Sequence, residues 1–146
     1  MMGFSVYFNQ KHNFMLTRLS GDINNNNLRN HVLNLNKLTE GVSRLREIAD
    51  GRKIENISCL TVEGTTIGAE LESNKPGSLL AIVVPDSPSF YGVARVYQTF
   101  AGNQRKGVIL FYTIRDALTW LGYGEVEIKE LITFVETVNN EFKPNS

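Results

Sequence analysis

Apolar residues along the chain fall into two kinds of segment: short β-favouring runs and longer stretches with helical spacing. The short runs predict strands, because continuous or alternating apolar residues of this length suit a buried sheet. Polar residues at 9–13 separate the first two runs, which predicts a β-hairpin. The expected strands are 4–8, 14–19, 45–50, 79–84 and 108–112.

Segments with helical spacing alternate with these strands. One helix is expected from the asparagine run at 24–27 to Leu38, another follows strand 79–84, and a short one is expected at 114–121. The resulting order is β-β-α-β-α-β-α-β-α-α. The sequence therefore predicts one α/β domain at 1–122, with a mixed, mostly parallel sheet that begins with an antiparallel hairpin.

The segment 58–73 allows two interpretations, a helix capped by Thr61 or a hairpin that turns at Glu63 and Gly64. The helix is favoured because it completes the alternation of strands and helices. Its glycines and threonines have low helix propensity, so we expect a weak element that is held by tertiary packing and opens easily. The spacing of Gly64 and Gly68 suits close packing against another helix.

A final amphipathic helix is expected from Glu125 to about Phe142, within a C-terminal extension at 123–146. A stripe of this kind must be buried, either against the domain itself or in a dimer interface, and the sequence favours neither. The stripe consists of Ile128, Leu131, Ile132, Val135, Val138 and Phe142.

The charges balance, with 15 lysines and arginines against 15 aspartates and glutamates. The chain therefore has no net charge with which to attract nucleic acid or an anionic membrane. The basic pairs at 52–53 and 105–106 are interpreted as solvated loop charges.

The N-terminus lacks the pattern of a signal peptide, and no apolar run approaches the ~20 residues of a membrane span. A cytoplasmic protein without membrane insertion is therefore expected.

Candidate catalytic residues are few. The single cysteine, Cys59, lies among apolar neighbours and is expected to be a small buried side chain. His12 and His31 have no accompanying motif and are expected to be structural. The sequence contains no nucleophile elbow, phosphate-binding loop or dinucleotide fingerprint, and no metal-ligand cluster. We therefore expect a non-catalytic protein without a cofactor or a bound metal.

The strand, turn and helix at 78–101 form the kind of corner where α/β proteins place their sites. Ser87 and Ser89 follow the strand at the start of the helix, where backbone N–H groups can hold an anion. Simple capping of the helix is the alternative role for these hydroxyl groups.

Tyr91, Arg95 and Gln98 recur at i, i+4 and i+7 on this helix and therefore share one face. This polar line is a candidate binding site for the head group of a ligand or for a partner protein. The alternative is that Arg95 pairs with a carboxylate such as Asp50 and orients the helix on the sheet.

The chain resembles the SpoIIAA-like proteins of the wider STAS class, which are bacterial anti-sigma-factor-antagonist-like domains. The resemblance rests on Val83-Val84-Pro85 and on the run Tyr-Gly-Val-Ala-Arg-Val-Tyr-Gln at 91–98. The strand that ends at Asp50 and the late segment Asp-Ala-Leu-Thr-Trp-Leu at 116–121 also contribute, and the whole covers about 4–122. It implies strands in chain order, with helices largely on one face of the sheet.

The resemblance also implies a regulatory or protein-interaction module, as a homodimer or with another protein. In the anti-sigma-factor antagonists an Asp-Ser motif carries the phosphorylated serine, whereas this chain has Asp50-Gly51 at that point. Ser58, Thr61 and Ser87 are the remaining candidates for phosphorylation. The alternative function is a carrier or sensor of a small amphipathic or lipid-like ligand, bound between the helix of Tyr91 and Arg95 and the weak segment 61–73.

Overall fold

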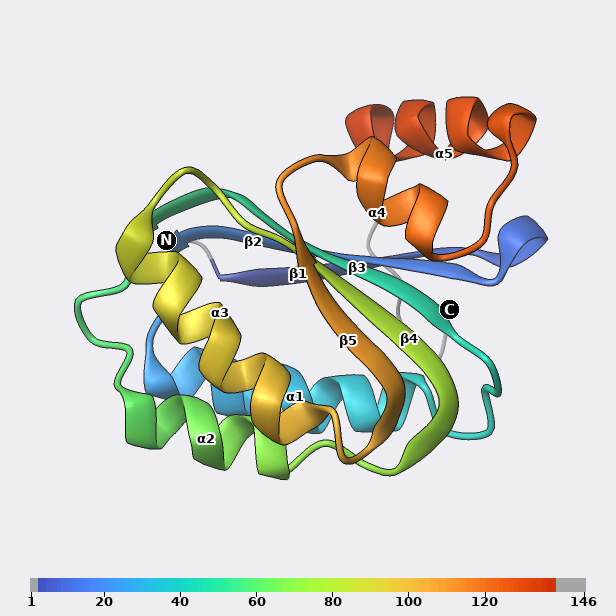
Figure 1. Ribbon diagram of the computed structural model, residues 1–146. Helices are drawn as coiled ribbons and strands as arrows, with labels where there is room; N and C mark the ends of the chain where they lie inside the picture. Colours follow the sequence, from blue (N-terminus) through green and yellow to red (C-terminus); the bar gives the residue numbers. More distant parts are fainter. Residues whose placement is uncertain (1–2, 139–146) are drawn as a thin grey trace.

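The sheet of the computed structural model has five strands that lie side by side in chain order (Figure 1). The structure describes residues 3–138. β1 and β2 are antiparallel and the other neighbouring strands are parallel, which confirms the predicted mixed sheet with its initial hairpin. The strands are β1 (Phe4–Asn9), β2 (Phe14–Asp22), β3 (Arg46–Asn56), β4 (Lys75–Val83) and β5 (Arg105–Phe111).

The hairpin turns through a single 3₁₀ turn, η1 (Gln10–His12), and then through Asn13. Asn13 has a φ of 49°, a left-handed conformation that asparagine tolerates better than most residues. Strand β3 is longer than expected, because it continues past Asp50 to Asn56 and pairs with the end of β2. The basic pair Arg52-Lys53 therefore lies in a strand and not in a loop.

Helices cover both faces of the sheet (Figure 1). One face packs against α1 (Asn25–Leu38), α2 (Val62–Glu70) and α3 (Pro88–Ala101), and the other against α4 (Ile114–Trp120) and α5 (Glu125–Thr137). The expectation that helices lie largely on one face is corrected accordingly. The central strands carry apolar side chains on both faces, so each face must be shielded from water.

Short polar side chains fix where the helices begin. The side chain of Asn24 accepts a hydrogen bond from the backbone N–H of Asn27, and the two residues form a capping box. Thr61, Ser87 and Thr113 accept equivalent bonds at the starts of α2, α3 and α4. Segment 58–73 therefore contains the predicted helix and not a hairpin.

Two glycines bring α2 close to α1. A Cβ atom on Gly64 would lie 2.1 Å from the Asn25 side chain, and one on Gly68 would lie 3.0 Å from Leu28. The side chain of Asn25 also bonds Thr61 through its carbonyl oxygen and its amide nitrogen. Close packing thus holds a helix whose own propensity is low.

The centre of the apolar stripe of α5 is buried within the chain. Ile128, Leu131 and Val135 pack on the sheet together with residues of α4. The helix ends at Thr137, five residues before the expected end at Phe142, which lies outside the described residues. Of the two predicted ways to bury the stripe, the structure shows docking on the domain itself for the part of the stripe that it describes, up to Val138.

Two side chains differ from the expectations of the sequence. Cys59 is exposed, because it lies in the turn between β3 and α2. Arg105 is buried at the start of β5, although its basic neighbour Lys106 is exposed.

Within residues 3–138, no helix has both the length and the apolar character needed to cross a membrane.

Candidate functional site

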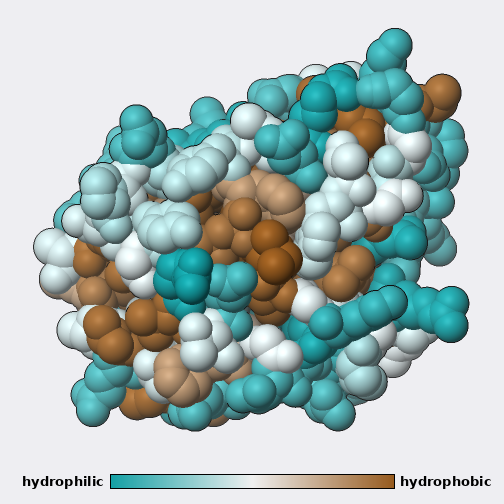
Figure 2. Space-filling view, in the orientation of Figure 1, coloured by the Kyte–Doolittle hydropathy of each residue, from teal (hydrophilic) through white to brown (hydrophobic). Residues whose placement is uncertain are grey.

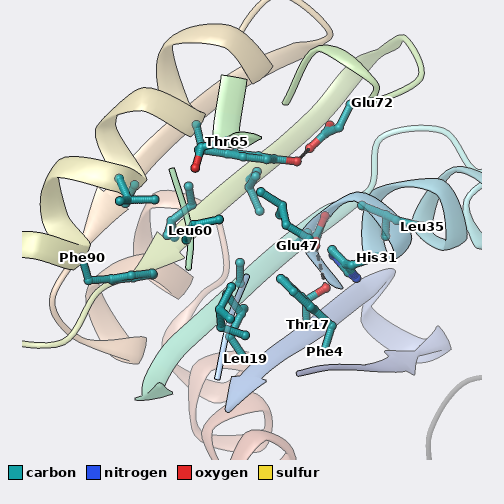
Figure 3. A pocket seen from close by; sticks show the side chains of 18 residues that line it. Phe4, Thr17, Leu19, His31, Leu35, Glu47, Leu60, Thr65, Glu72 and Phe90 are labelled. Atoms are coloured by element: carbon teal, nitrogen blue, oxygen red, sulfur yellow. Dashed lines mark hydrogen bonds between the residues drawn. The ribbon is translucent and has the colours of Figure 1, made fainter. Parts of the chain in front are cut away.

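A mostly apolar cavity of about 70 Å³ lies between the sheet and the helices α1, α2 and α3. Its volume exceeds that needed for one water molecule, ~10–15 Å³ on the same scale, so it has room for a small molecule. The close-up in Figure 3 shows Phe90, Leu60 and Leu19 along one part of the wall. Further apolar lining comes from Phe4, Ile23, Leu28, Leu35, Ala49, Leu80, Ile82, Val93 and Ala94.

The alternation of side chains along the strands decides which residues reach this cavity. Glu47 and Ala49 on β3 line the cavity, whereas Ile48 between them packs on the other face of the sheet. Thr17 and Leu19 on β2 line it as well. A shift of either strand by one residue in its pairing register would turn these side chains to the other face of the sheet.

The second wall is formed by α2 and the residues that flank it. Leu60, Thr65 and Glu72 line the cavity. The outward side of the same helix also carries apolar side chains, since Val62 is 64% exposed and Ile67 is 49% exposed. Figure 2 shows hydrophobic surface in the region of α2. The cavity therefore has a thin cover, a helix of nine residues with solvent behind it.

One end of the cavity adjoins a buried network of charges. The guanidinium of Arg105 donates from Nε to Glu72 Oε1 at 2.7 Å and from Nη2 to Glu47 Oε1 at 2.9 Å. The ammonium of Lys75 lies 3.8 Å from Glu72 Oε1. All four side chains are buried, so each charge depends on its partners for the solvation that water would supply.

Hydroxyl groups complete the network. Thr17 donates to Glu47 Oε2 at 2.7 Å, and the Tyr97 hydroxyl donates to Glu72 Oε2. Figure 3 shows the bond between Thr17 and Glu47 at the wall of the cavity. The remaining nitrogen of Arg105, Nη1, is buried and has no hydrogen-bond partner among the residues that the structure describes.

The network shifts the acid–base properties of its members. Burial raises the pKa of Glu47, but the charge of Arg105 and the bonds from Thr17 and Arg105 outweigh it, so the pKa lies below its usual value. Burial raises the pKa of Tyr97 well above its usual value, with the charge of Glu72 acting in the same direction. Both carboxylate and phenol therefore keep their neutral-pH forms, Glu47 charged and Tyr97 uncharged.

His31, on α1, adds an uncharged polar group to the cavity wall. Its ring stacks on Phe4, with centroids 4.3 Å apart and planes 9° from parallel. Burial lowers the pKa of His31 to about 4, against the opposing effect of Glu47. Neither ring nitrogen has a hydrogen bond within the described part of the chain, residues 3–138.

We expect His31 to make folding stability depend on pH. Its pKa is about 4 in the folded protein and 6.5 when unperturbed, so the unfolded chain binds more protons between these values. The stability that His31 contributes is present above pH 6.5 and is lost as the pH falls towards 4. Chemical denaturation at pH 7 and pH 4.5 should show a smaller loss for His31→Gln than for the wild type; equal losses would contradict the assignment.

The residues that the sequence singled out on α3 lie beside the cavity and not in it. Tyr91 stacks on Tyr112 with ring centroids 6.4 Å apart, and the side-chain amide of Gln98 donates to the backbone oxygen of Val108 at 2.8 Å. Arg95 is exposed and makes no ion pair within residues 3–138. The cavity instead touches the neighbouring face of α3, at Phe90, Val93, Ala94 and Tyr97.

Asp50 lies on the opposite face of the sheet from α3. Its carboxylate accepts bonds from Arg52, from Nε and Nη2 at 2.9 Å and from the backbone N–H at 3.1 Å. Arg52 also reaches Glu136 on α5 at 3.8 Å. Asp50 therefore has Arg52 as its partner and not Arg95, and it connects β3 with α5.

The candidate hydroxyl groups are dispersed. Ser87 accepts the capping bond of α3, and Ser89 is exposed as the second residue of the helix. Ser58 and Thr61 are both exposed near the start of α2, where Thr61 caps the helix. The structure does not bring any of these groups into the cavity lining.

Sequence reasoning missed the buried charges. Glu47 belongs to an apolar strand in which it shares a face with Ala49, and that position on an inward face was the available signal. Arg105 and Glu72 gave no comparable signal, because Arg105 is the first residue of β5 after a polar turn and Glu72 lies in the polar loop between α2 and β4. The two carboxylates that Arg105 bonds, on Glu72 and Glu47, lie 33 and 58 residues away from it in the chain.

Comparisons of the chain with models of protein families, with curated proteins and with solved structures gave no match. The function must therefore be argued from the cavity and its polar end. The resemblance to the SpoIIAA-like proteins stays a prediction from the sequence.

Proposed function

We propose that the chain is a non-catalytic binding domain that takes up a small amphipathic ligand in the cavity, as a sensor or carrier. One observation carries the proposal: an apolar cavity that adjoins a buried, hydrogen-bonded charge network at one end. Binding sites for small molecules commonly combine an apolar lining with a few fixed polar groups.

The wall formed by α2 supplies a route of entry. This helix contains two glycines and two internal threonines, so little local free energy opposes its opening. It is held at its start by Asn25 and at its end by Asn36, which bonds the backbone of Leu71 and Ser73. We propose that displacement of α2 admits the ligand and that these contacts close the cavity again.

The resemblance to STAS-class proteins supports a regulatory role for this binding. In the proposed role, occupancy of the cavity alters the position of α2, and a protein partner or a second copy of the chain detects the change. Such a coupling requires the ligand to prefer one position of α2 over the other.

Filling the cavity should abolish ligand binding without unfolding the domain. Ala94 is buried in the wall on α3, and Ala94→Leu places three additional carbons in the empty space. We expect the variant to weaken binding of 1-butanol at least about tenfold, since the space for the ligand is taken while overpacking stays small. Titration of the ¹⁵N-labelled protein, followed by amide chemical shifts, measures the effect.

Gly92→Ala is the matched control on the same helix, because a Cβ atom there has no neighbour within 4 Å. It should bind 1-butanol as the wild type does. If Ala94→Leu binds normally and Arg95→Gln does not, the ligand lies on the exposed face of α3 and the cavity is not the site.

A further inference from the structure

The charges at the polar end of the cavity balance before any ligand enters. Two carboxylates, Glu47 and Glu72, face two cations, Arg105 and Lys75, and all four residues are buried. A further buried charge in the cavity would have no counter-ion. Burial of an unpaired charge is strongly unfavourable, so the cavity should reject a small ion.

The hydrogen-bonding groups of the two cations already bond residues of the protein. Two nitrogens of Arg105 bond Glu47 and Glu72, and the amine of Lys75 donates to Ser73 Oγ at 3.0 Å. Neither cation lines the cavity, whereas both carboxylates do. An anionic ligand would therefore meet Glu47 and Glu72 first and be repelled.

The hydrogen-bonding groups that do line the polar end suit a hydroxyl group. Each oxygen of Glu47 accepts one hydrogen bond, from Thr17 or from Arg105, and retains a further lone pair. The neutral imidazole of His31 has one N–H donor and one acceptor nitrogen, and both lack partners within residues 3–138. Figure 3 shows His31 beside Glu47 and Thr17 at the cavity wall.

We propose that the cavity is specific for small neutral alcohols or phenols, whose hydroxyl donates to Glu47 and accepts from His31 while the carbon body lies towards Phe90 and Leu60. This inference rests on the proposed function, because it names the chemical class of the ligand for the same cavity. The inference predicts that carboxylates and amines with the same carbon chain as such an alcohol are not ligands.

Three probes with the same four-carbon chain test the class: 1-butanol, butyrate and butylammonium. Each is titrated at pH 7 into the ¹⁵N-labelled full chain, and xenon serves as an apolar probe that forms no hydrogen bonds. We expect 1-butanol to bind at least about a hundredfold more tightly than either ion, with shifts at the cavity amides.

His31 variants test the role of the imidazole. His31→Leu should weaken 1-butanol about three- to tenfold and leave xenon binding unchanged, whereas His31→Gln, which keeps a donor and an acceptor, should retain most of the affinity. Equal loss with both probes would show that His31 acts only in packing and would overturn the inference.

The results distinguish failure of the specificity for neutral hydroxyl compounds from failure of the proposed binding function. If butyrate or butylammonium binds as well as 1-butanol, the cavity is a ligand site but its specificity for neutral hydroxyl compounds is refuted. If neither xenon nor any of the three probes shifts the cavity amides, the proposed binding function fails as well.

Discussion

Arg105→Ala should lower the free energy of unfolding by about 3–5 kcal/mol, because it leaves buried carboxylates without their main counter-ion. The guanidinium is fully buried and bonds both Glu47 and Glu72. The two acidic groups would then have to take up protons, draw in water or lose their packing, and each of these costs free energy. Urea denaturation followed by circular dichroism measures the loss.

Arg115→Ala is the matched control for this substitution. Arg115 pairs with Glu125, but both side chains are at least half exposed, so the loss should stay below ~1 kcal/mol. A triple variant, Glu47→Gln, Glu72→Gln and Arg105→Met, should recover much of the stability, since it removes the unpaired charges together. If Arg105→Ala and Arg115→Ala prove equally mild, the buried network is not a strong determinant of stability.

We expect Leu131→Ala to lower the free energy of unfolding by about 2–5 kcal/mol, because it opens a cavity where α5 meets the sheet. Leu131 has no exposed surface and packs in a cluster with residues of β2, β3, β4 and α4. The same denaturation experiment measures the change.

Val126→Ala provides the comparison on the same helix. Val126 is 75% exposed, and its truncation should change stability by less than ~0.5 kcal/mol. Similar small effects for Leu131→Ala and Val126→Ala would mean that α5 contributes little to the domain. A large effect only for Leu131 would support the intramolecular docking of the helix.

The helices and strands and their order along the chain could be predicted from the sequence, because short-range signals determine them. The strands are apolar runs, and Asn24, Thr61, Ser87 and Thr113 each stand where a capping side chain is needed. These signals act within a few residues, so they can be recognised without knowledge of the tertiary structure.

The candidate site depended on longer-range information. Helical spacing correctly put Tyr91, Arg95 and Gln98 on one face of α3, but it could not say which face meets the cavity. The face of Phe90 and Ala94 lies one position away in the chain, which on a helix is about 100° of rotation. The sequence predicts a solvated charge at Arg105, because its buried partners, Glu47 on β3 and Glu72 just after α2, are distant in the chain.

The docking of α5 has a consequence for how the chain folds during synthesis. Because the strands lie in chain order, the sheet can grow strand by strand as the ribosome extends the polypeptide. The face that holds Phe14, Ile48 and Ala81, however, is covered by α4 and α5, whose residues are made after all five strands. Until α4 and α5 have been made, this apolar face stays exposed on the nascent chain. A chaperone that shields it at the ribosome should therefore raise the yield of native protein.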